Sequence, residues 1–245
     1  MPSPDPNIAS ANRRLARRFG FLVFFANILV IALALLLPQA KGNPNYHFQE
    51  FRLITLFSFI QLIATAWISW KTSQTRTSQV QPNSEKSFWQ RPRFLWIILT
   101  VGFLFLAIDE LISIHLLIRN VIHQMAGIKL SRETEWIGDL VMISYATAAL
   151  GILCFYRSEL KLFQTSWVPF AAAFVFLALT IFFDTELVYE LIPIFPEFCT
   201  VALDGAGRNV SEESFKLFSE CFFLIAVFNC LTEAKNLKSA RHLPD

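Results

Sequence analysis

Residues 19–37 read FGFLVFFANILVIALALLL, a run in which Asn27 is the only strongly polar side chain. A helix of about 20 apolar residues crosses a bilayer core about 30 Å thick. The run exceeds the roughly 7–15 apolar residues of a signal peptide, although four arginines precede it. We therefore interpret it as a retained transmembrane helix that ends at Pro38.

Five further segments have the length and apolar content of a membrane span. Together with the first run, they predict spans at residues 19–37, 51–70, 94–118, 136–156, 167–183 and 214–231. The composition agrees, because 54% of the chain is apolar and only 16% is charged, against about 25% charged in soluble domains. The sequence thus predicts an all-α polytopic membrane bundle of about six transmembrane helices, formed by residues 19–232.

Basic residues indicate how this bundle is oriented. Of the 21 Lys and Arg residues, 14 lie in the tail 1–18, the polar linker 71–93, the connection after the fourth span and the tail 233–245. Cytoplasmic loops carry an excess of Lys and Arg, so both termini are predicted to be cytoplasmic. The polar linker and the basic N-terminus are compatible with a bacterial inner membrane, which is the predicted location. The expected partners are membrane lipids and either another membrane protein or a second copy of the chain. Nucleic acid is not expected, since the net charge of +2 sums two opposed regions.

Acidic residues have the opposite distribution. Of the 19 Asp and Glu residues, 14 fall on the outer side or in the outer half of the predicted helices. From the helical rise of about 1.5 Å per residue, Asp109 and Glu110 lie about 22–24 Å along the third span and Glu220 about 10 Å into the sixth. Asp139 and Asp184 are expected at nearly the same level. Four consecutive spans thus bring carboxylates to one layer.

This layer is the candidate functional site. A charge at the centre of a membrane helix costs about 2.5–3.5 kcal/mol, so separate lipid-facing carboxylates are disfavoured. If they face one another, protons, a basic residue or a hard cation such as Ca²⁺, Mg²⁺ or Mn²⁺ must neutralise them. The possible metal ligands are Asp109, Glu110 and Glu220. The candidate polar site consists of Asp109, Glu110, Ser113, His115, Asp139, Asp184, Glu186, Glu213, Lys216 and Glu220.

Helical geometry refines the contacts around Asp109. At about 100° per residue, Asp109 and Ser113 share a helix face, whereas His115 reaches Asp109 only at the edge of a cavity or if the helix deforms. In a purely structural interpretation, Asp109 and Glu110 pair with Arg119 or Lys216 and fix helix packing. Both interpretations remain open from the sequence.

The start of the last predicted span also has two interpretations. Glu213, Lys216 and Glu220 fall within about 60° of one another on a helix, so Lys216 could neutralise either carboxylate. Alternatively, Ser211 caps the helix, and Glu212 and Glu213 lie in its first turn, where acidic side chains are favoured. The preceding segment 187–213 contains two prolines, and it could lie along the interface or fold over the acidic layer as a lid.

Two short motifs resemble those of uncharacterised bacterial six-helix membrane proteins. Residues 106–115 read LAIDELISIH, which resembles the Asp-Glu-x-x-Ser-Ile-His motif of that group, and residues 212–217 read EESFKL. Leu116 stands where the group often has a further Glu. The resemblance implies no established activity. Membrane hydrolases related to alkaline ceramidases are disfavoured, because the last span contains no HxxxH motif.

These observations support three functional hypotheses. The leading one is an outward-facing, carboxylate-lined site that binds a cation or protons, for transport or sensing. The second is an intramembrane metal-dependent hydrolase or lipid-modifying enzyme that uses Asp109 or Glu110 as general base or metal ligand. The third is an accessory or assembly subunit, in which the polar layer only locks packing against a partner. A divalent cation is the one cofactor that the residues suggest.

Overall fold

The computed structural model describes residues 6–37, 46–48, 52–78, 91–127, 136–184 and 205–241. Every regular element in these ranges is a helix, which confirms the all-α prediction for them. The elements are α1 (Pro6–Leu36), η2 (Tyr46–Phe48), α2 (Leu53–Thr77), α3 (Pro92–Ile112), α4 (Ile114–Ala126), α5 (Trp136–Phe155), α6 (Arg157–Leu160), η5 (Gln164–Ser166), α7 (Trp167–Asp184) and α10 (Gly205–Arg241).

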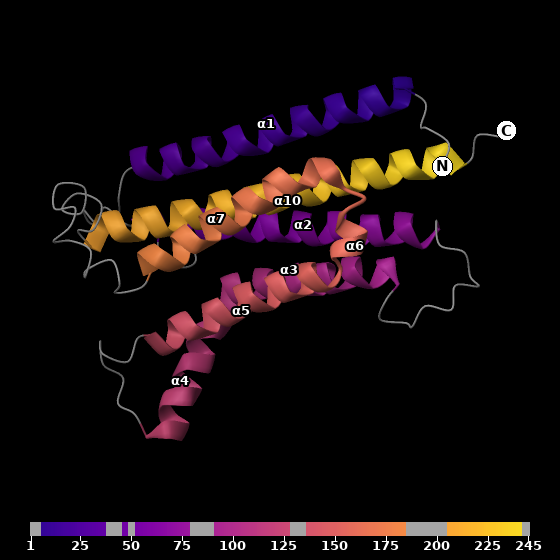
Figure 1. Ribbon diagram of the computed structural model, residues 1–245. Coiled ribbons are helices and arrows are strands. Elements are labelled where there is room, and N and C mark those ends of the chain that lie inside the picture. The colour runs from indigo at the N-terminus through magenta and orange to yellow at the C-terminus, as the bar shows by residue number, and fades with distance from the viewer. Residues whose placement is uncertain are drawn as a thin grey trace, which may run out of the picture.

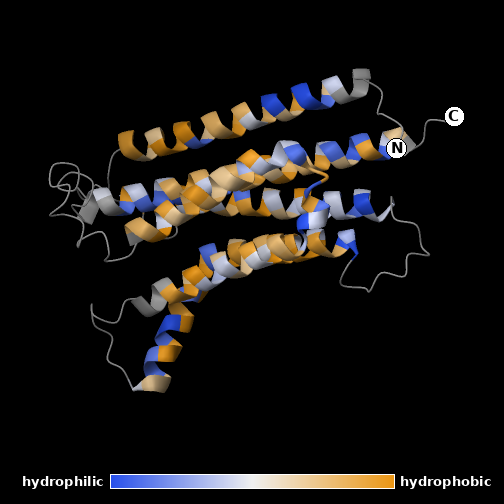
Figure 2. Cartoon of the chain, in the orientation of Figure 1, coloured by the Kyte–Doolittle hydropathy of each residue, from blue (hydrophilic) through white to orange (hydrophobic). Residues whose placement is uncertain are grey.

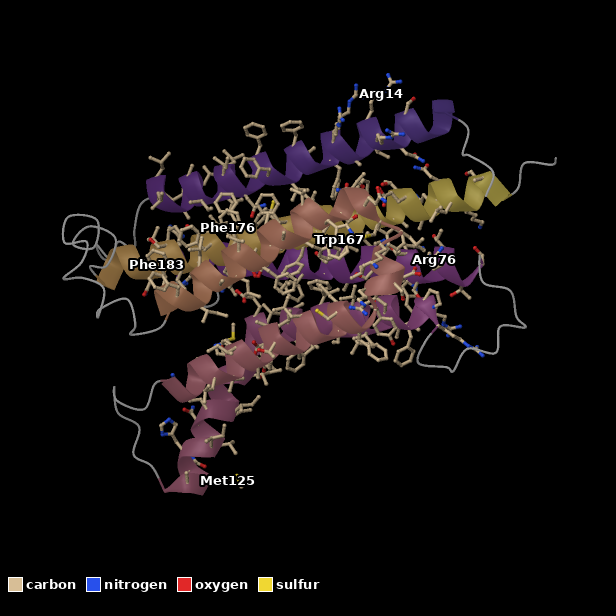
Figure 3. The ribbon with its side chains drawn as sticks, in the orientation of Figure 1. Arg14, Arg76, Met125, Trp167, Phe176 and Phe183 are labelled. Atoms are coloured by element: carbon tan, nitrogen blue, oxygen red, sulfur yellow. The ribbon has the colours of Figure 1, made fainter. Side chains whose placement is uncertain are left out.

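The long helices lie side by side in an elongated bundle (Figure 1). The helix α10 is central, because it packs against α7, α2 and α1, while α2 also packs extensively against α3. The short helix α4 contacts α5 and α3 and turns away from the bundle axis (Figure 1). We name the two ends of the bundle by their content. Arg14 and Arg76 lie toward the basic end, and Phe183 lies toward the acidic end, where α3 terminates and α10 starts (Figure 3).

Among the described residues, five helices are long and apolar enough to cross a membrane. They fall within Ser10–Leu36, Tyr46–Thr77, Pro92–Ile112, Gln164–Phe183 and Asn209–Ala240, and α5 adds a shorter apolar segment, Leu140–Phe155. Hydrophobic residues dominate the middle of these helices, and hydrophilic residues gather toward the basic end of α1, α2 and α10 (Figure 2). Large apolar side chains such as Phe21 and Leu22 are 65% and 69% exposed. These features fit a surface surrounded by lipid.

The helix boundaries differ from the predicted spans at four places. The predicted third span, 94–118, is interrupted at Ser113, where α3 gives way to α4. The predicted linker 71–93 begins as helix, because α2 continues through Thr77. Similarly, α1 already begins at Pro6 within the predicted tail. Because α10 begins at Gly205, Ser211 lies inside a helix, so the prediction that it caps the last span is wrong.

The packed core lies where α2, α3 and α10 meet near the basic end. Trp96 and Phe163 are almost fully buried there, with their rings edge to face at 5.4 Å. The side of α10 that joins this core carries small residues, including Ala226, Cys230 and Ala234. Small side chains let helix backbones approach closely in a membrane, where no hydrophobic force drives helices together.

A buried ion pair lies beside this core. The Arg76 guanidinium donates two hydrogen bonds to the Glu159 carboxylate, with Nε–Oε1 at 2.6 Å and Nη2–Oε2 at 2.9 Å. The two side chains are only 7% and 6% exposed. The indole Nε1 of Trp96 also donates to Glu159 Oε1, at 3.5 Å. The bidentate geometry ties the end of α2 to α6.

The buried face of α2 is polar along most of its length. Its buried polar residues recur every three or four positions, apart from the adjacent pair Thr72 and Ser73. They are Thr55, Ser58, Gln61, Thr65, Ser69, Thr72, Ser73 and Arg76. Several hydroxyls donate to the carbonyl one turn earlier, as Thr65 does to Gln61 at 2.8 Å. Gln61 exchanges two hydrogen bonds with Asn27 of α1, at 3.0 and 3.2 Å. The polar side chains on this face of α2 thus form their hydrogen bonds inside the bundle, because lipid offers them no partners.

Candidate functional site

A cavity of about 280 Å³ lies among α3, α5, α7 and α10, with Leu62 of α2 at its edge. Most of its wall is apolar and comes from side chains such as Phe103, Leu106, Met142 and Phe223. Its polar and ionisable lining residues are Asp109, Glu110, Tyr145, Lys216, Ser219 and Glu220. Three carboxyl groups and one amine therefore belong to the wall of an otherwise apolar cavity. We name this cavity the acidic pocket.

Lys216 joins two helices across the acidic pocket. Its Nζ lies 3.0 Å from Oε1 of Glu110 on α3 and 2.9 Å from Oε1 of Glu213 one turn earlier on α10. The three side chains are between 13% and 20% exposed, so these are charge-assisted hydrogen bonds in a largely dry environment. The contact between Glu110 and Lys216 is thus the one that the structural interpretation expected, and its role in fixing helix packing stays a prediction.

Glu220 is held by a different partner. Oε1 of Glu220 accepts a hydrogen bond of 2.6 Å from the Ser58 hydroxyl on α2, and the glutamate is only 7% exposed. Its second oxygen, Oε2, is buried and has no hydrogen-bond partner within the described part of the chain. The phenol oxygen of Tyr145 is in the same situation. Buried polar atoms without partners are rare in folded proteins, and they mark places where a ligand or water binds.

Asp109 connects the acidic pocket to the helix break. Its carboxylate accepts a 2.8 Å hydrogen bond from the backbone N–H of His115 and lies 3.0 Å from the His115 Nδ1. Both contacts require the chain to turn at Ser113, which has a left-handed backbone with φ 51° and ψ 51°. This conformation costs about 1–2 kcal/mol for a residue other than glycine. Asp109 offsets the cost by binding an otherwise unpaired N–H in the first turn of α4.

The helix therefore deforms in the way that the sequence argument required for His115 to meet Asp109. Asp109 and Glu220 both belong to the lining of the acidic pocket, where Asp109 contacts His115 and Glu220 contacts Ser58. His115 and Ser113 are not part of its wall. Arg119 lies on α4 and forms no ion pair with Asp109 or Glu110.

Three candidate residues fall where less is described. Asp139 lies in α5 and Asp184 is the last residue of α7, but their side chains lie outside the described part of the structure. Glu186 lies outside the described residues altogether, as does most of the segment 187–213 that was considered as a lid. Within the ranges that are described, no group of three or more Asp, Glu, His or Cys side chains could hold a metal ion.

Sequence reasoning missed three polar residues of this region. Ser58 binds Glu220, Tyr145 lines the acidic pocket, and the Ser219 hydroxyl donates to the Ala173 carbonyl at 2.9 Å. Ser58 had a detectable signal, because it belongs to the regular series of hydroxyl and amide residues along α2. The rotation of α5 that brings Tyr145 inward has no comparable sequence signal, because polar residues such as Ser144 and Thr147 lie on other sides of α5 and leave it without one distinct polar face.

The fold and the site together fit an all-α membrane protein with ionisable side chains in the wall of an apolar pocket. More particularly, the chain belongs to the family described as a domain of unknown function (DUF8692), whose model matches residues 21–231. The matched range contains every residue that lines the acidic pocket. No curated protein and no solved structure matches the chain.

Proposed function

We propose that this protein, with both termini in the cytoplasm, binds an organic cation in the acidic pocket, as a transporter or a sensor. The ligand class is an amine or quaternary ammonium group attached to an apolar body. One observation carries the proposal: the pocket is apolar along most of its wall, yet three carboxyl groups and only one lysine belong to its lining. Such a pocket is complementary to an amphipathic cation.

The distribution of partners supports a cation more than an anion. Lys216 is already neutralised by Glu110 and Glu213, so it offers little charge to an incoming anion. Glu220, in contrast, keeps one oxygen without a donor within the described residues. Without a ligand, a proton on a carboxyl group is the simplest way to neutralise the excess negative charge. Cation binding would then be coupled to proton release.

A divalent metal ion is a weaker candidate ligand. The described residues contain no cluster of three suitable side chains, and Ca²⁺ takes about six to eight oxygen ligands. The apolar wall also offers nothing to the water shell that Mg²⁺ retains. An ammonium group needs only one or two acceptors, and its apolar body replaces the water that a metal ion would require.

The test compares two probes of equal chain length and opposite charge. Decyltrimethylammonium and decylsulfonate are titrated into the purified protein in nanodiscs by equilibrium dialysis. We expect saturable binding of the ammonium probe alone, and release of protons into a weakly buffered solution as it binds. In Glu220→Gln the affinity should fall about tenfold or more, because the trimethylammonium group has no N–H to donate and is held by the charge of the carboxylate, which the amide lacks.

Glu212→Gln is the matched control, since it makes the same change on the same helix at a residue that does not line the pocket. Its affinity for decyltrimethylammonium should equal that of the unchanged protein. Equal binding of the two probes, or equal losses in Glu212→Gln and Glu220→Gln, would contradict the proposal.

A second candidate function is hydrolysis, and the contact between Asp109 and His115 favours it. A carboxylate at Nδ1 fixes the imidazole tautomer and leaves Nε2 able to act as a general base. The test is hydrolysis of a short-chain fluorogenic lipid ester by the purified protein. Activity that is lost in His115→Asn and kept in His47→Asn would support an enzyme. An inactive unchanged protein would exclude hydrolysis of that ester class.

A further inference from the structure

A second depression, distinct from the acidic pocket, lies near the basic end of the bundle. It is an open groove of about 820 Å³ between α1, α10 and the η5 turn. Its polar lining residues are Arg13, Arg17, Gln164, Thr165, Asn229, Thr232, Glu233 and Asn236. Its apolar lining residues include Gly20, Phe21, Phe24, Phe222 and Ile225. The groove therefore changes from polar to apolar along the direction in which α1 enters the membrane.

Two contacts hold α1 against α10 along this groove. Asn12 donates a hydrogen bond to the Asn236 side chain, and the rings of Phe19 and Phe228 are stacked with centroids 4.0 Å apart. Gly20 approaches Ile225 so closely that an added Cβ would lie 3.6 Å from that side chain. The groove is thus bounded by packed helices, rather than being a gap left by a loosely attached α1.

The charges on its two walls are opposite. Arg13 and Arg17 lie one turn apart on α1, and the ion pairs found among the described residues include neither of them. Arg13 is nevertheless near enough to Glu233 to act on it electrostatically across the groove. Glu233 lies on α10, where its Oε1 accepts hydrogen bonds from the Thr165 hydroxyl and backbone N–H, at 2.5 and 3.2 Å. Its Oε2 has no hydrogen-bond partner within the part of the chain that is described.

We infer that this groove binds an aminophospholipid of the membrane leaflet at the basic end. Its phosphate lies by Arg13 and Arg17, its primary ammonium group binds Glu233, and an acyl chain follows Phe21 and Phe24. The phosphate diester complements the two arginines of one wall, and the ammonium group complements Glu233 of the other wall. Arginines at a membrane interface attract lipid phosphates, and the apolar floor adds burial of the acyl chain.

The experiment measures lipid retention by native mass spectrometry of the full chain from detergent micelles. The micelles contain equal amounts of phosphatidylethanolamine, phosphatidylglycerol and phosphatidylcholine with identical acyl chains. We expect one phosphatidylethanolamine to be retained about tenfold over the other two, because a charge-assisted N–H bond distinguishes it from both. The choline headgroup has no N–H donor, and the glycerol headgroup has no positive charge.

Matched variants separate the two walls. Glu233→Gln should retain lipid but lose the preference for phosphatidylethanolamine over phosphatidylglycerol. The double variant Arg13→Gln/Arg17→Gln should retain little of any phospholipid. The control, Arg14→Gln/Arg18→Gln, removes the same charge from the same helix at positions that do not line the groove, and it should behave like the unchanged protein.

Several outcomes would overturn the inference. One is equal retention of the three lipids by the unchanged protein. Another is an equal loss of lipid in the two double-arginine variants, which would indicate a general effect of charge on α1. Displacement of the lipid by free phosphoethanolamine at equal concentration would make the groove a site for a soluble phosphate ester. If Arg13→Gln/Arg17→Gln fails to fold, the inference is still tested by the preference for phosphatidylethanolamine over phosphatidylglycerol. This preference is compared between the unchanged protein and Glu233→Gln.

Discussion

The ion pair between Arg76 and Glu159 allows a sharp test of how this bundle is held together. Replacing Arg76 by Met keeps a long apolar side chain over Phe163 but leaves the Glu159 carboxylate buried without its cation. Removing one partner of a buried ion pair costs about 3–5 kcal/mol. This lowers the folding equilibrium constant by between about a hundredfold and a few thousandfold.

The double variant Arg76→Met/Glu159→Met gives the opposite expectation. Replacing both charges by apolar side chains of similar size is often neutral or stabilising, so most of the loss in Arg76→Met should be recovered. Arg157→Met is the control, because Arg157 is exposed two residues before Glu159 in the same short helix, and its effect should stay within about 0.5 kcal/mol.

The free energy of unfolding is measured by titration with SDS in mixed micelles, followed by circular dichroism. The coupling energy of the cycle comes from the two single variants and the double variant. If Arg76→Met is as stable as the unchanged protein, the pair does not stabilise the bundle. If the double variant is no more stable than Arg76→Met, the loss comes from missing packing rather than from a stranded carboxylate.

Three further changes test the acidic end. Ser58→Ala removes the donor to Glu220 and should lower the free energy of unfolding by about 1–3 kcal/mol, with Ser58→Thr near neutral, in the same SDS titration. Ser113→Gly relieves the left-handed strain and should raise the thermal midpoint, whereas Ser113→Val should lower it, because β-branched residues fit this conformation poorly. Lys216→Met strands two carboxylates and should cost about 3–5 kcal/mol at neutral pH, part of which returns in Lys216→Met/Glu110→Gln.

The length of each apolar run predicted the apolar helices of the bundle, but not where these helices end. The predicted second span stops at Trp70, whereas α2 continues to Thr77 because its polar face remains buried against the rest of the bundle. The interior of a membrane protein need not be apolar, so hydropathy marks contact with lipid rather than the extent of the helix.

The site was predictable in outline and not in its contacts. The carboxylate layer was inferred from helix rise alone, and two of its members, Asp109 and Glu220, line the same pocket. The left-handed turn at Ser113 was not predictable, because serine has no intrinsic preference for that conformation and Asp109 stabilises it from the preceding turn. Lys216 could reach either Glu213 or Glu220 on the helix, and only the packing of α3 and α2 decided that Glu220 binds Ser58 instead.

The polar face of α2 also constrains how the protein is made. The hydrogen bond between Ser58 and Glu220 joins residues 162 positions apart, so α2 leaves the ribosome long before its partner helix α10 exists. Until then, other helices must keep the hydroxyl and amide groups of α2 out of contact with lipid. Asn27 of α1 binds Gln61, and α3 packs along α2. The packing of α10 therefore completes the cover over the polar face of α2. A chain truncated before Gly205 would leave part of this face exposed, and we expect the quality-control proteases of the membrane to degrade such a chain.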